Sequence, residues 1–508
     1  MTATQPRTET DITVRNPATG QVSGSVPIHD AAAVAKRADE LRAAQPEWEA
    51  MGPRGRKRWL LEFQNWLLDN ADHLTEVLIS ETGKSRVDAS LEPVATADNV
   101  NFWATHAEEY LSDRHPKAHS PLYRVNRFTT VYRPQPLVGV ITPWNFPLAM
   151  PGIDIAPALA AGSAVLLKPS EVTPLSGVEF VRGWAEIGAP PVLDLVTGYG
   201  DTGAALIDNV DYVQFTGSTA TGRRVAVACA QRLIPYSLEL GGKDPAIVLA
   251  DADLERAANG IAWGGLFNSG QVCVSVERVY VEAPVYDEFV DKLAAKVRAV
   301  SQGTDRDTGA MATEAQRDLV ARHVDEATAT GARVLAGGKP TGVGTFFAPT
   351  VLADVDQTMA CMTDETFGPT IPVVKVADEN EAIRLANDSS YGLSATVWTG
   401  DPHRGERIAR RLEVGAVNVN DALANVFCPT LPMGGWKSSG VGYRAGGPHG
   451  ILKYCRQQAI TAPRFPTQKS ELMWYPASKR KSRFALAAMR ASSARGWRRF
   501  GIKPRGAR

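Results

Sequence analysis

The chain has 508 residues, of which 44% are apolar and 22% are charged, with 55 basic and 55 acidic side chains. This composition is typical of a soluble globular protein that is too long for one hydrophobic core, so we expect two large domains. The sequence contains no run of about 18 apolar residues, the length needed to span a bilayer, and no signal peptide is readable at the N-terminus. Five widely spaced cysteines without a CxxC pair argue against disulfides and a zinc site and favour a reducing compartment.

The first part of the chain is expected to be mainly helical. The turn at 16–20 separates two short extended segments, and Asp30 is placed to cap a helix over 31–49. Further helices are predicted over 54–82 and 89–110, and the alternating segment 123–132 predicts a strand or hairpin.

The next part alternates short apolar strands with helices, which predicts an α/β fold with a parallel sheet. The strands are expected at 138–141, 164–167, 193–197, 212–215 and 246–249. Ligands of such sheets gather at the carboxyl ends of the strands, so the residues that follow these strands are candidates for a site.

Two strand ends carry suitable residues. After the strand at 212–215, Gly217 and Ser218 form a small-residue turn before a helix, whose free amides could hold a pyrophosphate. The sequence is not a GxGxxG fingerprint, and a plain turn is the alternative. After the strand at 164–167, Lys168 and Glu171 could contact a ribose, or both could be solvated surface charges.

A cysteine follows another small-residue turn in the stretch 267–273. Gly270 would allow a close approach of the backbone to a substrate, and Cys273 would stand at the start of a regular element. A lone cysteine beside valines is more often a buried small hydrophobe than a nucleophile. His115 and His119 are four residues apart, but Pro116 spoils a helical face, so no metal site is expected.

Together these stretches resemble the NAD(P)-dependent aldehyde dehydrogenase family. Six motifs occur in that family's order between about residue 16 and residue 462. They are Pro143-Trp144-Asn145-Phe146-Pro147, Lys168-Pro169-Ser170-Glu171, Phe215-Thr216-Gly217-Ser218, Leu238-Glu239-Leu240-Gly241-Gly242-Lys243, Gly270-Gln271-Val272-Cys273 and Glu365-Thr366-Phe367-Gly368-Pro369.

The resemblance assigns a role to individual positions. It implies that Cys273 is the nucleophile, that Glu239 is the base for the deacylating water, and that Asn145 with the amide of Cys273 forms the oxyanion hole. It places the coenzyme, NAD with NADP as the alternative, against Trp144, Lys168, Glu171, Gly217, Ser218, Glu365 and Phe367.

The same resemblance implies an aldehyde dehydrogenase-like architecture. It predicts a Rossmann-type coenzyme domain over 1–121 and 137–241 and an α/β catalytic domain over 242–440. A small β oligomerisation element is predicted over 122–136 and 454–463, followed by a basic tail over 464–508. A homodimer or homotetramer is expected.

The chain departs from the family pattern at two places. Asp154 stands in a neighbourhood where many members carry a Lys in a proton-exit path. Near the C-terminus, Arg444-Ala445-Gly446-Gly447 replaces a familiar R-E-x-G pattern. The family pattern therefore does not predict the route by which the base releases its proton in this chain.

Three alternatives concern the activity. Relatives that pass the acyl group to coenzyme A lack the carboxylate at the position of Glu239, so hydrolysis is favoured. A structural protein that keeps only the fold is disfavoured because Cys273, Glu239 and Asn145 are all retained. The loop 422–433 has no Lys or Arg, which favours a medium- or long-chain or aromatic aldehyde over the alternative, succinic semialdehyde.

The tail differs from the rest of the chain in charge. Residues 464–508 carry 13 basic residues and one acid, Glu471. A continuous amphipathic helix would put Leu486, Met489, Trp497 and Phe500 on one face and Arg480, Lys481, Arg495, Arg498 and Arg499 on the other. We therefore expect a cytoplasmic protein whose tail contacts anionic membranes, with a disordered tail as the alternative and no nucleic-acid partner.

Overall fold

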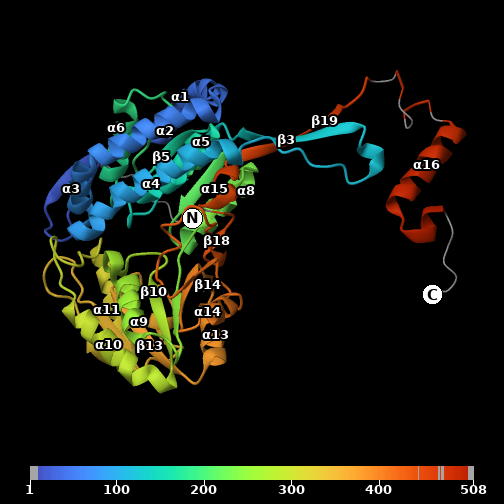
Figure 1. The fold of residues 1–508 in the computed structure, drawn as a ribbon. Coiled ribbons are helices and arrows are strands. Elements are labelled where there is room, and N and C mark those ends of the chain that lie inside the picture. Colours follow the sequence, from blue (N-terminus) through green and yellow to red (C-terminus); the bar gives the residue numbers. More distant parts are fainter. Residues whose placement is uncertain (1–9, 444, 467–468, 471–473, 477, 501–508) are drawn as a thin grey trace. The chain divides into compact units, whose positions relative to one another are not determined.

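The computed structural model describes residues 10–443, 445–466, 469–470, 474–476 and 478–500. The chain forms two compact units, Met1–Tyr110 with Pro134–Tyr454, and Leu111–Arg133 with Cys455–Arg508. The first unit contains two large parallel sheets with helices packed on them, which confirms the predicted α/β class (Figure 1).

A six-stranded sheet has the order β18-β8-β7-β4-β5-β6. All neighbours are parallel except β18, which returns from late in the chain and runs antiparallel to β8. Its strands are β4 Leu137–Ile141, β5 Ala164–Lys168, β6 Leu193–Leu195, β7 Tyr212–Thr216, β8 Tyr236–Glu239 and β18 Gly440–Val441. The residues of β4, β5 and β7 are buried on both faces, as expected for parallel strands covered by helices.

Helices cover this sheet in layers. Those in contact with its strands are α1 Ala31–Ala50, α5 Ala149–Ala161, α6 Leu175–Glu186, α7 Gly200–Asn209 and α8 Thr219–Arg232. Three more helices, α2 Gly52–Asp69, α3 Ala71–Thr82 and α4 Arg86–Tyr110, pack outside α5 and α6. Asp30 caps α1 by accepting from Ala33 N, as predicted.

A seven-stranded sheet has the order β11-β12-β13-β10-β9-β15-β16 and is parallel except for β11. Its strands are β9 Asp244–Val248, β10 Val276–Glu282, β11 Arg333–Ala336, β12 Thr350–Ala353, β13 Thr370–Val376, β15 Ser394–Trp398 and β16 Ala416–Val419. One face packs on α9 Leu254–Leu266 and α10 Tyr286–Ala299. The other packs on α11 Glu314–Ala329, α13 Glu379–Asn387 and α14 Pro402–Ala409.

Smaller elements complete the first unit. They are the pairs β1 Asp11–Arg15 with β2 Val22–Pro27 and β14 Tyr391–Gly392 with β17 Trp436–Lys437, the helices α12 Ala360–Thr363 and α15 Gly447–Leu452, and the 3-10 turns η2 Phe267–Gly270 and η3 Ala283–Val285.

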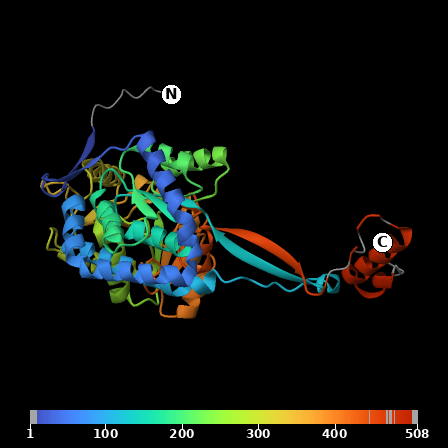
Figure 2. The same cartoon turned by 90° about the horizontal axis from the view of Figure 1, so that it is seen from above.

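The second unit contains a two-stranded sheet and a helix. The sheet pairs β3 Asn126–Pro134 with β19 Cys455–Pro463, and α16 Lys479–Ser493 packs on the 3-10 turn η1 Pro121–Tyr123 (Figure 2). A further 3-10 turn, η4, spans Gly496–Phe500. Within the described residues, no helix is long and apolar enough to cross a membrane.

Two predicted helices are interrupted. The helix expected over 54–82 divides at Asn70, which has φ −103° and ψ 13° and separates α2 from α3. The continuous tail helix was also wrong, because α16 ends at Ser493, Ala494 is extended and Gly496 has φ 58°. Serine and glycine have low helix propensity, which explains the break before the turn that contains Phe500.

Candidate active site

The loop that carries Cys273 begins with a left-handed turn. Asn268, Ser269 and Gly270 have φ values of 50°, 56° and 71°. Two successive non-glycine residues in this region cost roughly 1–2 kcal/mol each, so the turn needs strong support from its surroundings. A Cβ at Gly270 would lie 2.1 Å from the carbonyl oxygen of Gly368. In this structure the missing side chain of Gly270 thus makes room for a neighbouring loop.

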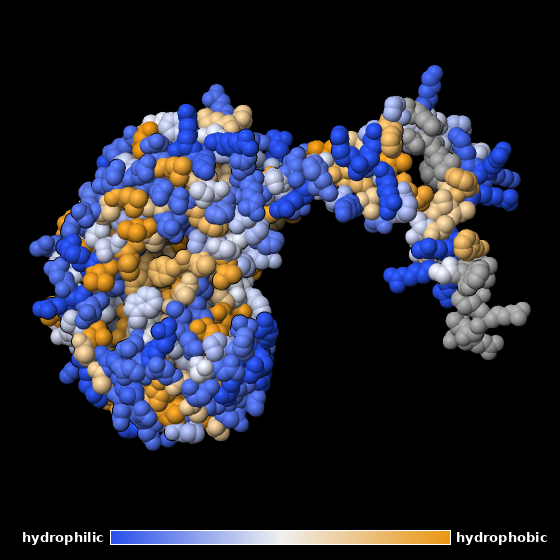
Figure 3. All heavy atoms as spheres, in the orientation of Figure 1, coloured by the Kyte–Doolittle hydropathy of each residue, from blue (hydrophilic) through white to orange (hydrophobic). Residues whose placement is uncertain are grey.

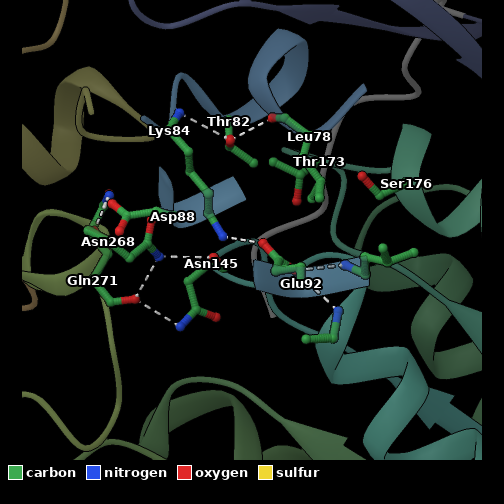
Figure 4. A network of polar contacts seen from close by, with 12 residues as sticks. Leu78, Thr82, Lys84, Asp88, Glu92, Asn145, Thr173, Ser176, Asn268 and Gln271 are labelled. Atoms are coloured by element: carbon green, nitrogen blue, oxygen red, sulfur yellow. Dashed lines mark hydrogen bonds and ion pairs between the residues drawn. The ribbon is translucent and has the colours of Figure 1, made fainter. Parts of the chain in front are cut away.

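Buried amide side chains provide that support. Asn268 Nδ2 donates to the carbonyl oxygens of Asn145 (3.0 Å) and Gln271 (3.2 Å). Asn145 Nδ2 donates to the same Gln271 oxygen at 2.9 Å. The side chain of Gln271 is itself held, because its Oε1 accepts from Ala312 N at 2.8 Å. These bonds tie the predicted oxyanion residue directly to the loop of the predicted nucleophile (Figure 4).

An apolar cavity leads to Cys273. Together with its open mouth the cavity has a volume of about 1190 Å³. Its walls come from α4, α5, the cysteine loop and the segment 423–433, and Figure 3 shows apolar side chains gathered around a hollow below α4. The apolar lining residues include Leu91, Phe146, Met150, Ile153, Phe267, Val272, Leu423, Val426, Phe427, Leu431 and Met433. No Lys or Arg is found among the described residues that line it, whereas Glu92 and Asp98 are.

A second cavity meets Cys273 from another side. Seven of the ten sequence-predicted residues line it: Cys273, Asn145, Trp144, Gly217, Ser218, Glu365 and Phe367. The rings of Trp144 and Phe367 meet edge to face with centroids 5.3 Å apart. The structure therefore places the predicted nucleophile at the junction of an apolar cavity and a cavity built from the predicted coenzyme residues.

The sheet topology explains why these residues meet. Strand β4 lies between β5 and β7 in the sheet. From β5 the chain continues to β6 on one side of β4, and from β7 it continues to β8 on the other side. A parallel sheet has a crevice at such a point, at the carboxyl ends of the strands. Trp144 and Asn145 follow β4, and Gly217 and Ser218 follow β7. Ser218 also caps α8 by accepting from Thr221 N, so the positive end of this helix faces the crevice.

Lys168 and Glu171 lie at the same edge of the sheet, where Lys168 is the last residue of β5 and Glu171 follows it. Lys168 is 5% exposed, and its Nζ lies 3.8 Å from Glu171 Oε2 and donates to Pro169 O at 3.1 Å. Burial lowers the pKa of Lys168, and the Glu171 carboxylate partly offsets that effect. Neither residue is among the described residues that line the two cavities, and the Glu171 side chain is 42% exposed.

Glu239 is the last residue of β8 and is 1% exposed. Its backbone oxygen accepts from Gly217 N at 3.0 Å, which brings it next to the coenzyme crevice. In the described part of the chain the lining of the second cavity includes its neighbours Leu240 and Gly241, whereas Glu239 lines neither cavity.

The linker between the two sheets carries two glycines whose role the sequence did not indicate. A Cβ at Gly241 would lie 2.4 Å from Glu365 Oε2, and one at Gly242 would lie 2.2 Å from Cys273 O. Gly242 N donates to Glu365 Oε1 at 2.9 Å. Burial, with repulsion from Glu277, raises the pKa of Glu365 to about 8.

Two buried ion pairs were also missed. Lys243 Nζ lies 2.6 Å from Glu277 Oε2, and Glu277 accepts from the backbone N of Thr366 and Phe367, both at 2.7 Å. Lys84 and Glu92 form the second pair. Charged residues inside apolar stretches, such as Glu277 in Val276–Val281, were the signal for such pairs, because buried charges require partners.

Other sequence features lie apart from the site. Asp154 is completely buried in α5. The described residues that line the apolar cavity include its neighbour Ile153 but not Asp154. Arg444 lies outside the described residues. The part of the chain that the structure describes holds no group of three or more His, Cys, Asp or Glu suited to a metal ion.

Comparisons with known proteins identify the family of the chain. Residues 3–460 match the model of the aldehyde dehydrogenase family. The chain is 41% identical over 455 residues to “Putative succinate-semialdehyde dehydrogenase NADP(+) 2” of Mycobacterium tuberculosis, covering 88% of this chain and 87% of that protein. It is 38% identical over 474 residues to 4,4'-diapolycopene aldehyde oxidase of a Methylomonas species, covering 92% and 89%.

A solved structure shows the same fold. The NAD-dependent aldehyde dehydrogenase from Sinorhizobium meliloti matches with a TM-score of 0.86 and 33% identity, covering 90% of this chain and 93% of that one.

Proposed function

Because the chain belongs to the aldehyde dehydrogenase family, we propose that it oxidises an apolar aldehyde to the carboxylate with NAD, through covalent intermediates on Cys273. The observation that carries this proposal is the position of Cys273 at the junction of the two cavities. An aldehyde carbon held at that junction can be attacked by sulfur from one side and lose hydride toward the other.

The second cavity suits a nicotinamide dinucleotide. It lies at the carboxyl ends of β4 and β7, offers the N-terminus of α8 to a pyrophosphate and contains a carboxyl, Glu365, for ribose hydroxyls. The nicotinamide supplies the hydride acceptor when the coenzyme is bound. Gly217 and Gly241 line this space, so the backbone lies close to it.

The chemistry follows from the side chains at the junction. The Cys273 thiolate adds to the aldehyde carbon, which forms a C–S bond and places negative charge on oxygen. Asn145 gives one amide hydrogen to Gln271 O, so its second hydrogen and the amide of Cys273 can stabilise that oxygen. The carbonyl reforms as the C–H bond breaks and hydride leaves, and a thioester remains.

Water then clears the thioester. Glu239 accepts a proton from the water as it attacks, the C–S bond breaks, and the acid leaves as its carboxylate. For each aldehyde, one coenzyme is reduced, one water is consumed and two protons are released.

The apolar substrate class rests on the cavity lining. A carboxylated aldehyde needs a cation, best an Arg, but the described lining offers only acids as charged groups. The name of the Methylomonas relative also points to a large apolar aldehyde. Succinic semialdehyde is the second candidate, because the mycobacterial relative is named for it. A specificity constant for succinic semialdehyde above those for decanal and benzaldehyde would favour this alternative.

Two variants test the mechanism. Cys273→Ala should abolish NADH formation with every aldehyde. Glu239→Gln should release about one NADH per site and then slow by roughly 10²-fold or more, because the thioester is not hydrolysed. Stopped-flow absorbance measures both phases. A Glu239→Gln enzyme with the parent's steady-state rate would exclude Glu239 as the base.

We further propose that the protein is a cytoplasmic homo-oligomer whose basic tail contacts anionic lipid. The five cysteines are widely spaced and include no CxxC pair, which suits a reducing compartment. Members of this family are typically oligomeric, and the paired strands β3 and β19 leave open edges that could join another subunit.

A further inference from the structure

A buried ion pair lies at one wall of the apolar cavity, where Glu92 is a lining residue. Lys84 follows α3 and Glu92 belongs to α4, and each side chain is 2% exposed. Lys84 Nζ contacts Glu92 Oε1, while Lys84 N donates to Thr82 Oγ1 at 3.2 Å (Figure 4). Such a pair is expensive to bury, so it needs a reason beyond stability.

The pair holds the segment between Asn145 and α5. Glu92 Oε2 accepts from Leu148 N at 3.2 Å and from Ala149 N at 3.0 Å. The N-cap of α5 is Leu148, which has no side-chain acceptor, so Glu92 supplies the missing cap and the negative charge that a helix N-terminus favours. Lys84 Nζ lies 4.1 Å from the centre of the Phe146 ring.

Asn145 is thus held from both sides. Its own backbone oxygen and side chain are bonded to Asn268 and Gln271 of the cysteine loop. Of the residues that follow it, Phe146 contacts Lys84 through its ring, and Leu148 and Ala149 donate to Glu92. Only a short stretch of backbone separates the two anchors, so a shift of either one moves the Asn145 amide.

We propose that Lys84 and Glu92 are positioning residues that fix Asn145 as an oxyanion donor to the adduct on Cys273. This inference rests on the proposed aldehyde oxidation and adds to it a device outside the reacting groups. A misplacement of about 1 Å at a catalytic group can lower a rate by about 10²-fold. Glu92 itself is no candidate base, since Oε1 is occupied by Lys84 and Oε2 by two amides.

The first test is Glu92→Gln. The Gln oxygen should turn toward the Lys84 cation, which leaves its NH₂ group facing the amides of Leu148 and Ala149. The NH₂ group and the two backbone N–H groups are all hydrogen-bond donors, so both hydrogen bonds are lost and the segment should shift. We expect kcat per active site to fall by about 10²-fold, with the KM for the aldehyde and NADH affinity within about threefold of the parent. NADH titration by fluorescence counts the competent sites.

The second test is the double variant Lys84→Met/Glu92→Gln. With no cation beside it, the Gln oxygen is free to accept from Leu148 and Ala149 again. The double variant should therefore recover at least tenfold of the kcat lost in Glu92→Gln, which a simple loss of stability does not explain. Glu282→Gln is the matched control, because Glu282 is also buried, accepts from Ala250 N and pairs with Arg404 away from both cavities.

The outcomes are separable. If the parent oxidises no aldehyde, the proposed function fails. If the parent is active and Glu92→Gln keeps the parent's kcat per titrated site, the positioning role is wrong, whatever the melting temperature does. A double variant that is as slow as Glu92→Gln, or a Glu282→Gln control that loses as much kcat, also overturns it.

Discussion

At the scale of residues, buried glutamates hold the backbone around the site. Three of them each accept two successive backbone N–H groups at the edge of a segment that carries predicted site residues. They are Glu81 on Leu175 and Ser176, Glu92 on Leu148 and Ala149, and Glu277 on Thr366 and Phe367. A carboxyl that accepts from two amides fixes the backbone there, and Glu81 and Glu92 do so at the N-termini of α6 and α5.

Glu365 should make the stability of the free enzyme depend on pH. Burial raises its pKa to about 8 from the ordinary 4.5, so the folded protein keeps a proton that the unfolded chain loses. The stability of the parent should therefore fall, relative to Glu365→Gln, as pH rises from about 4.5 to 8. The expected slope is about 1.4 kcal/mol per pH unit at most. Denaturant unfolding of both proteins at pH 5.5, 7 and 8.5 measures it, and a constant difference would contradict the raised pKa.

Glu171 should decide between the coenzymes. Its carboxylate, beside Lys168 at the end of β5, suits a ribose 2′-hydroxyl and repels a 2′-phosphate. We expect a higher kcat/KM with NAD than with NADP, and Glu171→Gln should shift the ratio toward NADP by roughly tenfold, the effect of about 1.4 kcal/mol. Glu179→Gln is the control, because Glu179 is a partly exposed carboxylate of α6 that is paired with a neighbouring cation, Arg182. A parent that prefers NADP would overturn the assignment, since Lys168 is also close.

At the scale of elements, local signals predicted more than distant ones. The parallel strands were readable because each is a short apolar run, and the cap at Asp30 because its hydrogen bond is local. The pairing of Gly440 with Glu239, the left-handed turn before Cys273 and the Lys84–Glu92 pair were not readable. The first two depend on contacts between segments far apart in sequence, such as the bond from Asn268 to Asn145. Lys84 and Glu92 are only eight residues apart, but Lys84 lies in a polar stretch that gives no sign of burial.

The candidate site was readable for a related reason. Its residues lie in short motifs next to strand ends, so the resemblance located seven of them in one cavity. The sequence could not show that Glu239 is buried outside that lining, or that Gly241 and Gly242 make room for Glu365 and Cys273.

Helix α4 should extend the binding surface for long substrates. Val87, Leu91 and Val94 are 61%, 41% and 52% exposed and share one helix face, and Leu91 also lines the cavity. Each methylene that leaves water contributes about 0.8 kcal/mol, so kcat/KM should rise up to about fourfold per carbon until the apolar surface is covered.

A pair of leucine variants tests this surface. Leu91→Asp should lower kcat/KM by about tenfold for dodecanal and little for propanal, which does not reach α4. Leu68→Asp, at a leucine of α2 that is 43% exposed, is the control. Equal losses for both aldehydes would show that α4 does not contact the chain of the substrate.

At the scale of the whole molecule, the charge is unevenly divided. Residues 464–508 carry 13 basic residues and one acid, whereas the rest of the chain carries 42 basic and 54 acidic residues. The tail belongs to the unit that contains the β3–β19 sheet. Ala485 of α16 is buried, while Leu486 and Met489 are 64% and 44% exposed. The basic charge of the tail suits two kinds of partner, an anionic lipid surface or the acidic part of another subunit.

The proposed membrane contact would use both the charge and the exposed apolar side chains of α16. Leu486 and Met489 are three residues apart and share one face of the helix, and Arg483 and Arg490 border it. Apolar side chains flanked by cations suit the boundary between acyl chains and anionic headgroups, where each cation contributes about 1 kcal/mol. The full chain should therefore sediment with phosphatidylserine vesicles at low salt and less at 0.5 M salt, where charges are screened over a few ångströms. A chain that ends at Ser470 should stay in solution.

Leu486→Ser/Met489→Ser separates the two partners, because it keeps every charge and removes the exposed apolar face. It should lose most vesicle binding if α16 inserts its side chains into lipid. A subunit contact made by charge alone would leave this variant with the parent's oligomeric state, while the truncated chain would dissociate in light-scattering measurements. If the double substitution leaves vesicle binding unchanged, the tail contacts the membrane through its charges alone. If the truncated chain still sediments with vesicles, the tail is not the membrane contact.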